Sequence, residues 1–571
     1  MKTEPLIRVI GLGASFHQHG ESNVVLHGLH FDISPGETLG IVGESGSGKS
    51  VSSMSILRLI PSPPIQYDEG SIYYGPLEID LLKADESLLQ SLRGNDISMI
   101  FQEPMTSLNP LKSCGDQVIE VFEIHKRHPR SSWKERVLEL FAEVQLPDPL
   151  RAYSAFPHEL SGGQKQRIVI AMAIASEPKL LIADEPTTAL DVTVQRTILE
   201  LLKGIQKRMN MAMIFISHDL AVVSTIADRI LVMKQGEIVE QGFSAQVIQS
   251  PSHDYTRALL ASRPPQEGRP LRLKTVQDHL GPNQGQEILQ ETKASRTERH
   301  KTLYESAPVF EVQDLHTWYP IRSGIFQSVT DHVRALNGVS FNIYPGETLG
   351  VVGESGCGKS TLGRTLIGLE KAHSGQIIYK GRSVLEMDKK KKAAMVKEVQ
   401  MIFQDPYSSL NPRQKVGEAI LEPMLVHGIH ANRKERIAAV HSLLKEVGLQ
   451  ESHFERYPHE FSGGQRQRIC IARALAMNPE VIVCDESVSA LDVSVQAQVL
   501  NLLNQLKAER GLSYLFISHD LSVVRYMSDR VMVMNKGECV EYGEADQMYA
   551  TPKNTYTKKL VASAYALDSE T

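Results

Sequence analysis

Short, unbroken apolar runs recur along the chain, and the clearest pair lies at residues 39–42 and 349–352. Each run follows a Pro-Gly-Glu turn and leads into a glycine-rich string, at residues 43–50 in the first case and 353–360 in the second. An apolar run of this length between a turn and glycines predicts a buried strand. The pattern therefore predicts the order strand, glycine-rich loop and helix twice in one chain.

The glycine-rich strings have the spacing Gly-x-x-x-x-Gly-Lys-Ser of a phosphate-binding loop. Glycines let the backbone turn its N–H groups toward phosphates, and the helix N-terminus behind them adds a positive field. We expect Lys49 and Lys359 to reach the β- and γ-phosphates of ATP, and the hydroxyl groups of Ser50 and Ser360 to bind Mg²⁺. A lone copy is often an ordinary glycine turn, but two copies in the same context favour two ATP sites. The predicted nucleotide-binding positions are Gly43, Ser45, Gly46, Gly48, Lys49, Ser50, Gly353, Ser355, Gly356, Gly358, Lys359 and Ser360.

A second pair of apolar runs, at residues 180–183 and 481–484, ends in two carboxylates. Such runs suit parallel strands that are covered on both faces, and ligands bind such sheets beyond the carboxyl ends of the strands. We expect Asp184 and Asp485 to bind Mg²⁺. A lone Asp-Glu pair after a strand is usually a turn, but the phosphate loop upstream of each pair favours the functional interpretation.

The residues that follow these aspartates, Glu185 and Glu486, are predicted to polarise the attacking water. A third pair of apolar runs ends in Ser-His-Asp, with the histidines at His218 and His519. A histidine in this position is often only a structural hydrogen-bonding group. Beside the two glutamates, we expect it to sense the γ-phosphate.

The string Ser-Gly-Gly-Gln-x-Gln-Arg occurs in both halves, before a mostly apolar helix. A serine hydroxyl, free amides and the helix dipole form an anion site. The structural alternative is a plain helix N-cap, which does not explain why the whole string is repeated. The predicted ligand-binding residues are Ser161, Gly162, Gly163, Gln164, Ser462, Gly463, Gly464 and Gln465.

The landmarks repeat at a nearly constant separation, which divides the chain into two homologous halves. Lys49 and Lys359 lie 310 positions apart, whereas Asp184 and Asp485 lie 301 apart, as do the serines and histidines of the other motifs. The back two-thirds of each half therefore align almost without gaps. The first half carries its extra residues just after its phosphate loop.

The repeat predicts three parts of the chain. A first ATPase domain with a short tail is expected at residues 1–262, and a second with its own tail at 307–571. Residues 263–306 contain Pro-Pro and Gly-Pro pairs and a long polar run, so we predict a flexible, solvated linker there.

Composition limits the class of protein. The 571 residues are 42% hydrophobic and 22% charged, as in an ordinary globular protein, and the net charge of −6 does not favour a nucleic-acid surface. No window approaches the roughly 18 apolar residues of a membrane span, and the first residues do not resemble a signal peptide, so a cytosolic chain is predicted. The five cysteines form no C-x-x-C pair, which indicates neither a zinc site nor an iron–sulfur cluster.

These motifs follow one another in the order found in the ATPase domains of ABC transporters, and both halves resemble that family. The resemblance implies an α/β fold with two P-loop (RecA-like) ABC ATPase domains, each with a helical signature subdomain and an antiparallel β edge. It implies that the domains close head to tail. Lys49 would then share one ATP with the string that begins at Ser462, and Lys359 would share the other with the string that begins at Ser161.

The same resemblance assigns further contacts to the nucleotide. Gln102 and Gln404 are implied to contact the nucleotide and its Mg²⁺. The adenine ring is implied to stack on Phe16 in the first half. In the second half it would stack on Tyr319, with Trp318 as the alternative, although an aromatic residue on an entry strand is more often part of the core.

A finer resemblance concerns the class of transporter. The loops that run from Gln102 to Pro110 and from Gln404 to Pro412, each ending in Ser-Leu-Asn-Pro, resemble those of oligopeptide, dipeptide and glutathione importer ATPases. The tails at residues 251–260 and, more weakly, 554–560 resemble the tail of the same group. The chain looks like the fused form of a pair of subunits. Some relatives carry a cysteine cluster in the tail, which this chain lacks.

This resemblance implies a function. The chain would hydrolyse ATP to energise the import of peptides or peptide-like solutes. Its partners would be two integral-membrane permease subunits, contacted near the two Ser-Leu-Asn-Pro loops, and indirectly an extracytoplasmic solute-binding protein, with no nucleic acid. It would lie as a peripheral protein on the cytoplasmic face of the inner membrane.

Other interpretations remain open at this point. A soluble tandem ATPase of the F class, which acts on the ribosome, also has two domains, but its linker is typically a long, charged helical arm. A DNA-repair ATPase would need zinc-binding cysteine pairs, and a fused sugar importer usually has one degenerate site. The second half departs from the family pattern at Ser487 and Phe461, which removes no phosphate or metal ligand, so two working sites are expected. The lysine run at 389–392 suits a solvated helix face, with anionic lipid as the alternative.

Overall fold

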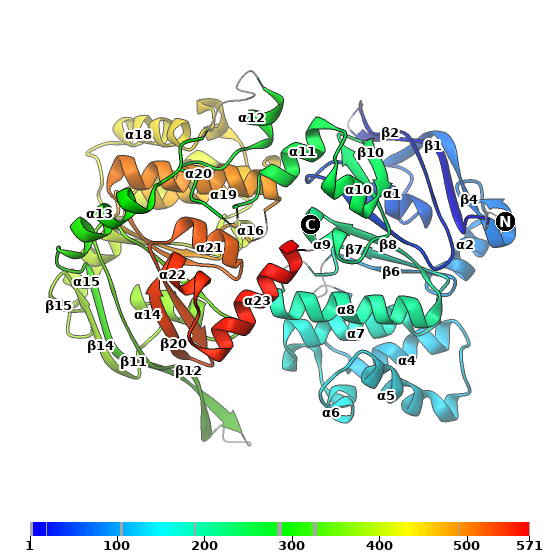
Figure 1. Cartoon of the computed structure of the whole chain (residues 1–571), viewed down its shortest axis with the longest axis horizontal. Helices are drawn as coiled ribbons and strands as arrows, with labels where there is room; N and C mark the ends of the chain where they lie inside the picture. The colour runs from blue at the N-terminus through cyan, green and yellow to red at the C-terminus, as the bar shows by residue number, and fades with distance from the viewer. Residues whose placement is uncertain are drawn as a thin grey trace. The chain divides into compact units, whose positions relative to one another are not determined.

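Figure 1 shows the computed structural model of the chain. It describes all residues except 1–3, 19, 103–106, 188–189, 266, 282–287, 324–327, 490 and 570–571. Contacts divide the chain into two compact units: the first comprises Met1–Leu190, Val194–Ala261 and Ala566–Thr571, and the second Asp191–Thr193 and Ser262–Tyr565. Each unit is described by itself below.

In the first unit, an antiparallel sheet has the order β2-β1-β4-β5, and a mostly parallel sheet has the order β10-β9-β3-β8-β7-β6. Its strands are β1 (Ile7–Gln18), β2 (Glu21–Ile33), β3 (Thr38–Val42), β4 (Ile65–Tyr74), β5 (Ile79–Asp80), β6 (Ile97–Ile100), β7 (Leu180–Asp184), β8 (Ala212–Ser217), β9 (Arg229–Lys234) and β10 (Glu237–Phe243). Its helices are α1 (Lys49–Ile56), α2 (Glu86–Leu92), α4 (Cys114–Ile124), α5 (Trp133–Glu143), α6 (Pro149–Ser154), α7 (Gly162–Ile174), α8 (Val192–Met209), α9 (Leu220–Ser224), α10 (Ser244–Gln249) and α11 (Asp254–Ala261).

The second unit repeats this plan, with the orders β12-β11-β14-β15 and β16-β17-β18-β13-β19-β20. Its strands are β11 (Phe310–Ser323), β12 (Ser328–Ile343), β13 (Thr348–Val352), β14 (Ser374–Tyr379), β15 (Arg382–Ser383), β16 (Val399–Ile402), β17 (Val481–Asp485), β18 (Ser513–Ile517), β19 (Arg530–Asn535) and β20 (Glu538–Glu544). Its helices are α12 (Val276–Leu280), α13 (Lys293–Tyr304), α14 (Lys359–Leu366), α15 (Lys389–Glu398), α16 (Pro406–Ser409), α17 (Val416–Val426), α18 (Arg433–Glu446), α19 (Gly463–Leu475), α20 (Val493–Arg510), α21 (Leu521–Met527), α22 (Ala545–Ala550) and α23 (Thr555–Ser569).

The apolar runs of the sequence form the centre of each parallel sheet, as predicted. Every residue of β3, β7 and β8 is buried, and so is every residue of β13, β17 and β18. Ile214 on β8 pairs in parallel register with Leu39 on β3 and with Ile182 on β7. Because parallel strands end at the same edge of a sheet, the polar residues that follow these runs gather there.

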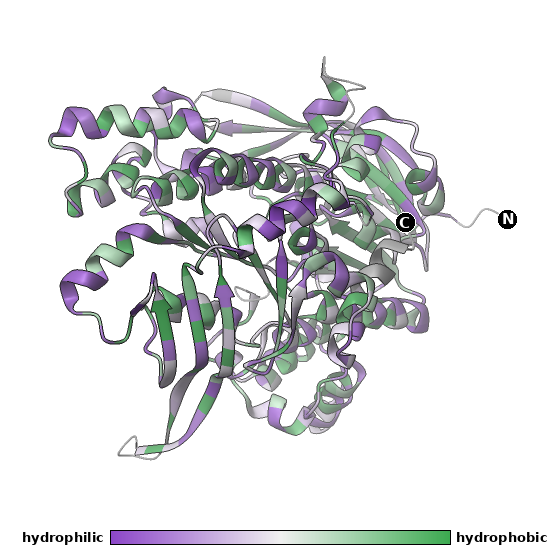
Figure 2. Ribbon diagram, turned by 60° about the vertical axis from the view of Figure 1, so that its left-hand side comes forward, coloured by the Kyte–Doolittle hydropathy of each residue, from purple (hydrophilic) through white to green (hydrophobic). Residues whose placement is uncertain are grey.

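The antiparallel sheets follow a different pattern, since one face packs on the core and the other does not. Along β12, the part near Ile343 alternates between buried and less buried positions. Figure 2 shows the corresponding alternation of apolar green and polar purple along the strands of this sheet. Period-two alternation of this kind is the usual signature of a half-covered sheet.

Residues 263–306 differ from the solvated coil that their composition predicts. They include helices α12 and α13, and a bridge between Pro270 and Gln290 joins the two arms of the segment. Contacts group the segment with the second unit. We call residues 269–304 the docked segment.

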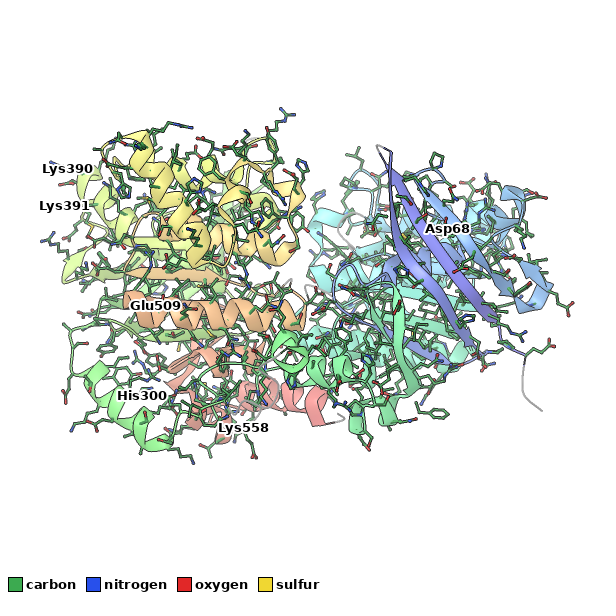
Figure 3. All side chains as sticks on the ribbon, turned by 90° about the horizontal axis from the view of Figure 1, so that it is seen from above. Asp68, His300, Lys390, Lys391, Glu509 and Lys558 are labelled. Carbon is green, nitrogen blue, oxygen red and sulfur yellow. The ribbon has the colours of Figure 1, made fainter. Side chains whose placement is uncertain are left out.

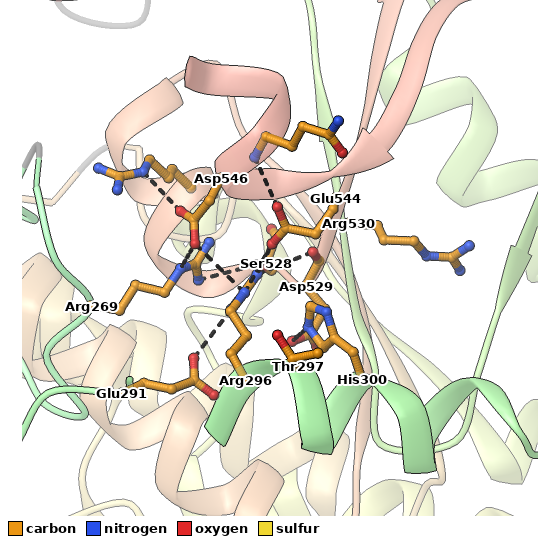
Figure 4. Close-up of polar contacts among 12 residues, drawn as sticks. Arg269, Glu291, Arg296, Thr297, His300, Ser528, Asp529, Arg530, Glu544 and Asp546 are labelled. Atoms are coloured by element: carbon orange, nitrogen blue, oxygen red, sulfur yellow. Dashed lines mark hydrogen bonds and ion pairs between the residues drawn. The ribbon is translucent and has the colours of Figure 1, made fainter. Parts of the chain in front are cut away.

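Two buried arginines hold the docked segment on the second unit (Figure 4). Arg296 donates to the carbonyl oxygen of Asp529 at 3.1 Å and pairs with Glu544 at 2.9 Å. Arg269 donates to Asp546 Oδ2 at 2.9 Å. Both arginines are less than a tenth exposed. A guanidinium group can be buried in this way because carboxylates and carbonyl oxygens accept hydrogen bonds from most of its donors. Composition alone cannot distinguish this case from solvation.

The internal repeat explains why these contacts form on the second half. At an offset of 301, Glu544 corresponds to Phe243 and Asp546 corresponds to Ala245. The first half therefore lacks the two carboxylates outside the segment that pair with the buried arginines.

The lysine run at 389–392 begins α15, and all four lysines are exposed. Figure 3 shows Lys390 and Lys391 at the periphery of the second unit. This exposure is what a solvated helix face requires. Among the described residues, no helix has both the length and the apolar character needed to cross a bilayer.

Candidate functional site

The first glycine-rich string joins β3 to α1 and is held in shape by its own lysine. Gly43 has a φ of 157°, and a Cβ there would lie 2.2 Å from the carbonyl oxygen of Met233, so glycine is required. Lys49 is 5% exposed, and its Nζ donates to the carbonyl oxygens of Gly43 at 2.7 Å and Glu44 at 2.9 Å. The loop is thus preformed, with a buried ammonium group at its mouth.

The second string repeats this geometry between β13 and α14. A Cβ at Gly353 would lie 2.2 Å from the carbonyl oxygen of Met534. Lys359 Nζ donates to the carbonyl oxygens of Gly353 at 2.7 Å and Glu354 at 3.0 Å. In each loop the residue before the lysine is a glycine with positive φ that starts the helix, which leaves the first amides of the helix directed at the loop.

The two predicted metal-binding aspartates end β7 and β17. Asp184 and Asp485 are 2% and 1% exposed. Burial raises the pKa of Asp184 to about 6, with a hydrogen bond from Ser50 opposing the shift and Glu185 adding to it. Burial also raises the pKa of Asp485, against the hydroxyl of Ser360, which donates to Asp485 Oδ1 at 2.8 Å.

The buried Asp184, together with its partner Ser50, fits a cation. Within the part of the chain that the structure describes, Asp184 Oδ1 has no hydrogen-bond partner. A buried carboxylate with a raised pKa gains most from a positive charge nearby. The described residues also contain no group of three His, Cys, Asp or Glu side chains that could hold a metal ion. The serine hydroxyl and the aspartate carboxylate could hold Mg²⁺ together with substrate phosphates, which is its usual mode in nucleotide sites, and Gln102 and Gln404 are the further predicted ligands.

Glu185 and Glu486 follow the aspartates in an unusual backbone conformation. Their φ angles are 48° and 46°. Residues other than glycine seldom adopt this region, and such outliers cluster at functional sites. The N–H of each glutamate donates to a carbonyl oxygen of the neighbouring strand, Ile216 at 3.0 Å and Ile517 at 2.9 Å, which holds the turn in place.

In the first unit, the predicted glutamine and histidine converge on the glutamate. Gln102 Nε2 donates to Glu185 Oε2 at 3.2 Å, and His218 Nδ1 lies 3.4 Å from the same oxygen. The three residues come from segments far apart in the sequence. The edge of the sheet brings them together.

The second unit assembles the same group. Gln404 Nε2 donates to Glu486 Oε2 at 2.8 Å, and His519 Nδ1 lies 3.5 Å from that oxygen. Lys359 Nζ lies 3.9 Å from Glu486 Oε1. Burial would raise the pKa of Glu486, but His519 and Lys359 outweigh it and lower that pKa. The carboxylate is therefore ionised at neutral pH, as a group that accepts a proton or orients water must be.

The Ser-Gly-Gly-Gln strings begin α7 and α19 as helix caps. The N–H of Gln164 donates to Ser161 Oγ at 3.4 Å, and the N–H of Ser161 donates to Gln164 Oε1 at 3.0 Å. Ser462 and Gln465 make the same reciprocal pair, at 3.4 and 3.1 Å. The N-cap alternative is thus present in both halves. Both serines are exposed, so capping does not prevent them from meeting a ligand.

The aromatic candidates for the adenine ring differ in their surroundings. Phe16 is half-buried and packs against the core of the first unit. Trp318 stacks on His373 with ring centroids 4.0 Å apart, and the guanidinium of Arg334 lies 5.0 Å from its ring. Because Trp318 is engaged in this cluster, Tyr319, which is half-buried, is the better candidate in the second unit.

Two tyrosines of the tails contact the phosphate loops, and the sequence reasoning did not assign them a role. The N–H of Glu44 donates to the hydroxyl of Tyr255 at 3.3 Å, and the N–H of Glu354 donates to the hydroxyl of Tyr556 at 3.1 Å. The available signal was their recurrence at the offset of 301. Residues 103–106 of the first predicted partner loop lie outside the described residues, whereas the second loop, from Gln404 to Pro412, is described throughout.

The matches to known protein families cover both halves of the chain. The family model described as ABC transporter matches residues 26–188 and 336–489, which include both phosphate loops and both Asp-Glu strand ends. The chain belongs to the ABC transporter ATPases. The model described as oligopeptide/dipeptide transporter, C-terminal region, matches residues 239–286 and 540–571 of this ABC ATPase.

Curated relatives match the ABC ATPase over nearly its whole length. A protein of Pectobacterium atrosepticum named glutathione import ATP-binding protein GsiA is 44% identical over 570 residues, which cover 99% of this chain and 90% of the relative. The protein of the same name from Escherichia coli K12 is 46% identical over 563 residues, covering 98% of this chain and 89% of the relative. The predicted resemblance to importer ATPases is confirmed. These comparisons do not support the ribosome-acting alternative.

Proposed function

We propose that this ABC ATPase energises the import of peptides or peptide-like solutes through a membrane permease. The observation that carries the proposal is the match of both tails to the oligopeptide/dipeptide transporter region. The curated relatives, which match nearly the whole chain, are named for glutathione import. Glutathione is itself a small peptide, so both comparisons favour the same class of solute.

Each phosphate loop would bind ATP through its amides and its lysine. Mg²⁺ would be held by Ser50, Gln102 and Asp184 in the first half, with Ser360, Gln404 and Asp485 as their counterparts. The bound ion would neutralise charge on the phosphates. The buried aspartate and its serine partner support this assignment.

The glutamate of each half would act as the base that orients the attacking water. Glu185 accepts a hydrogen bond from Gln102 and lies beside His218, so its carboxylate is fixed in direction. The histidine would contact the γ-phosphate. Because it also lies beside the glutamate, it would link the presence of the phosphate to the position of that carboxylate. A general base must be aligned with the water that it activates and must carry a suitable charge. The geometry of the glutamate in both halves supports the first of these conditions.

ATP binding would close the two halves over shared nucleotides. The string at Ser462 would complete the site of Lys49, and the string at Ser161 would complete the site of Lys359. Both serines are exposed at helix N-termini, which favours an approaching anion. The energy of closure would be the differential affinity of ATP for the closed state.

The permease would dock near the loops that follow Gln102 and Gln404. Large apolar side chains beside these loops are exposed, namely Phe101 at 47% and Leu111 at 85% in the first half, and Tyr407 at 61% in the second. Exposed apolar side chains next to these loops favour a protein contact there. We place the ATPase as a peripheral protein on the cytoplasmic face of the inner membrane, with a solute-binding protein on the other side.

Affinity purification from detergent-solubilised membranes tests this function. We expect two permease subunits, and a solute-binding protein, to accompany the tagged chain, and an apolar-to-charged variant such as Leu111→Asp to lose them. Co-sedimentation with ribosomes and the absence of any membrane subunit would contradict the proposal.

A further inference from the structure

The peptide group that joins Gly43 to Glu44 is held from both sides. Its carbonyl oxygen accepts a hydrogen bond from Lys49 Nζ at 2.7 Å, and its N–H donates to the hydroxyl of Tyr255 at 3.3 Å. Tyr255 lies on the tail helix α11 and is fully buried. The tail therefore forms a hydrogen bond to the same peptide group as the lysine of the phosphate loop.

The second unit contains the same arrangement. The carbonyl oxygen of Gly353 accepts from Lys359 Nζ at 2.7 Å, and the N–H of Glu354 donates to the hydroxyl of Tyr556 at 3.1 Å. Tyr556 lies on the tail helix α23. Two independent copies, each within one unit, make a chance packing contact a poor explanation.

The start of each tail helix is anchored by a carboxylate of the edge strand. Glu240 on β10 accepts from the N–H groups of Ser252 at 2.7 Å and His253 at 3.1 Å. Glu541 on β20, 301 positions later, accepts from the corresponding N–H groups at 2.9 and 3.0 Å. The anchor and the tyrosine of each half both lie within the tail region that the transporter model matches.

We propose that Tyr255 and Tyr556 are positioning residues for ATP binding. Each fixes the peptide group whose carbonyl oxygen accepts a hydrogen bond from the phosphate-loop lysine. This inference rests on the proposed assignment of Lys49 and Lys359 to ATP. It assigns the tails of both halves a role within the nucleotide sites.

The physical reason is that the lysine must change its hydrogen-bond partners when ATP binds. The lysine must leave the loop carbonyl to reach the phosphates, and at that moment the peptide group loses its partner on one side. The tyrosine hydroxyl still accepts the hydrogen bond from the N–H on the other side of the peptide group. The loop therefore keeps the conformation in which its amides face the phosphates. Burial raises the pKa of Tyr556 to about 12, so this phenol stays protonated at neutral pH. Preorganisation of this kind strengthens binding because less ordering remains to be done.

The test uses the full chain with both tyrosines changed, Tyr255→Phe and Tyr556→Phe, which removes the two hydroxyl groups and keeps the rings. The dissociation constant for ATP, measured by displacement of a fluorescent ATP analogue, should rise about three- to tenfold, as for one lost hydrogen bond per site. The KM for ATP should rise with it, while kcat changes much less.

A matched control is Tyr514→Phe. Tyr514 is also fully buried, and its hydroxyl donates to the carbonyl oxygen of Leu503 at 2.9 Å, away from the phosphate loop. We expect this variant to lose thermal stability without a change in ATP affinity. If the double variant behaves like this control, with lower stability but unchanged ATP affinity and KM, the tail tyrosines are structural and the inference is overturned.

A second control separates this inference from the assignment on which it rests. Lys49→Ala together with Lys359→Ala should abolish ATP binding. If it does not, the proposed sites are wrong. If it does while the tyrosine variant binds ATP normally, the sites stand and the role of the tails fails.

Discussion

Asn501 on α20 pairs with the backbone of Leu273 in both directions. The N–H of Leu273 donates to Asn501 Oδ1 at 2.8 Å, and Asn501 Nδ2 donates to the carbonyl oxygen of Leu273 at 2.9 Å. The side chain of Leu273 is buried in a core cluster of the second unit. The position 301 residues earlier is Glu200, which is exposed. The second half thus recognises the docked segment through a residue that the first half lacks.

Replacing Asn501 with Ala should loosen the docked segment. Two hydrogen bonds to a single backbone site are lost, at a cost of about 1–3 kcal/mol for the groups left unpaired. Hydrogen exchange followed by mass spectrometry should show faster exchange in residues 288–304. Glu200→Ala serves as the control, since an exposed substitution should leave that exchange unchanged. Equal protection in both variants would show that the asparagine does not hold the segment.

Asp529 should make the second unit sensitive to acid. Burial alone would raise the pKa of this carboxyl, but Lys507, His300 and Arg299 outweigh it and hold that pKa well below its usual range. A depressed folded-state pKa contributes stability above the unfolded value of about 4, and that stability is lost as the pH falls through the folded-state pKa. Asp529→Asn should therefore lower the free energy of unfolding at neutral pH and flatten its dependence on pH in acid.

Urea unfolding between about pH 3 and about pH 7 checks this prediction. The control is Asp228→Asn in the first unit, where the equivalent carboxylate accepts the N–H of Thr38 at 2.8 Å. We expect a larger change for Asp529→Asn, since the docked segment adds a histidine and an arginine to its surroundings. An unchanged acid slope in Asp529→Asn would refute the role of this carboxylate.

The two glycines of the second Ser-Gly-Gly-Gln string should respond differently to substitution. A Cβ at Gly464 would lie 2.1 Å from Val495 Cγ1, whereas at Gly463 the nearest atom is Leu491 Cδ2 at 3.9 Å. Gly464→Ala should therefore lower thermal stability, since overpacking costs about 1–3 kcal/mol.

Gly463→Ala should fold normally, because its own unit has room for the methyl group. If nucleotide approaches this helix N-terminus closely, the added methyl group should lower ATPase activity by about tenfold or more through misalignment. Melting temperature and ATPase rate, measured on both variants, separate the two effects. Full activity in a stably folded Gly463→Ala protein would count against ATP binding at this string.

Removing both candidate bases should stop turnover while ATP still binds. In Glu185→Gln with Glu486→Gln, the amide cannot accept the proton of the attacking water, and loss of a general base typically costs about 10²- to 10⁴-fold. The assay is release of inorganic phosphate by the purified full chain, with nucleotide binding measured in parallel. The exposed Glu200→Gln is the matched control and should retain its activity. Near-normal hydrolysis in the double variant would refute the assignment of the base.

The core of each site could be predicted from local patterns. The apolar runs before Gly43, Glu185 and His218 are buried strands in the structure, and parallel pairing gathers their ends at one edge. Such runs are informative because burial on both faces requires nearly every residue to be apolar. The internal repeat supports each assignment, because the second half places the corresponding residues in the same way.

Other features depend on contacts between distant residues, which no local pattern reveals. Glu185 and Glu486 adopt a positive φ that their residue type disfavours, and the surrounding structure maintains it. The segment at 269–304 has the polar composition of a solvated linker, yet Arg296 is buried because Glu291 in the same segment and carboxylates more than 200 residues away neutralise it. Local sequence patterns therefore determined the buried strands and the loops that carry the candidate ligand-binding residues. The docking of the segment and the contacts of the tail tyrosines depend instead on long-range pairing of charges and hydrogen bonds, which arises only when the folded chain brings these groups together.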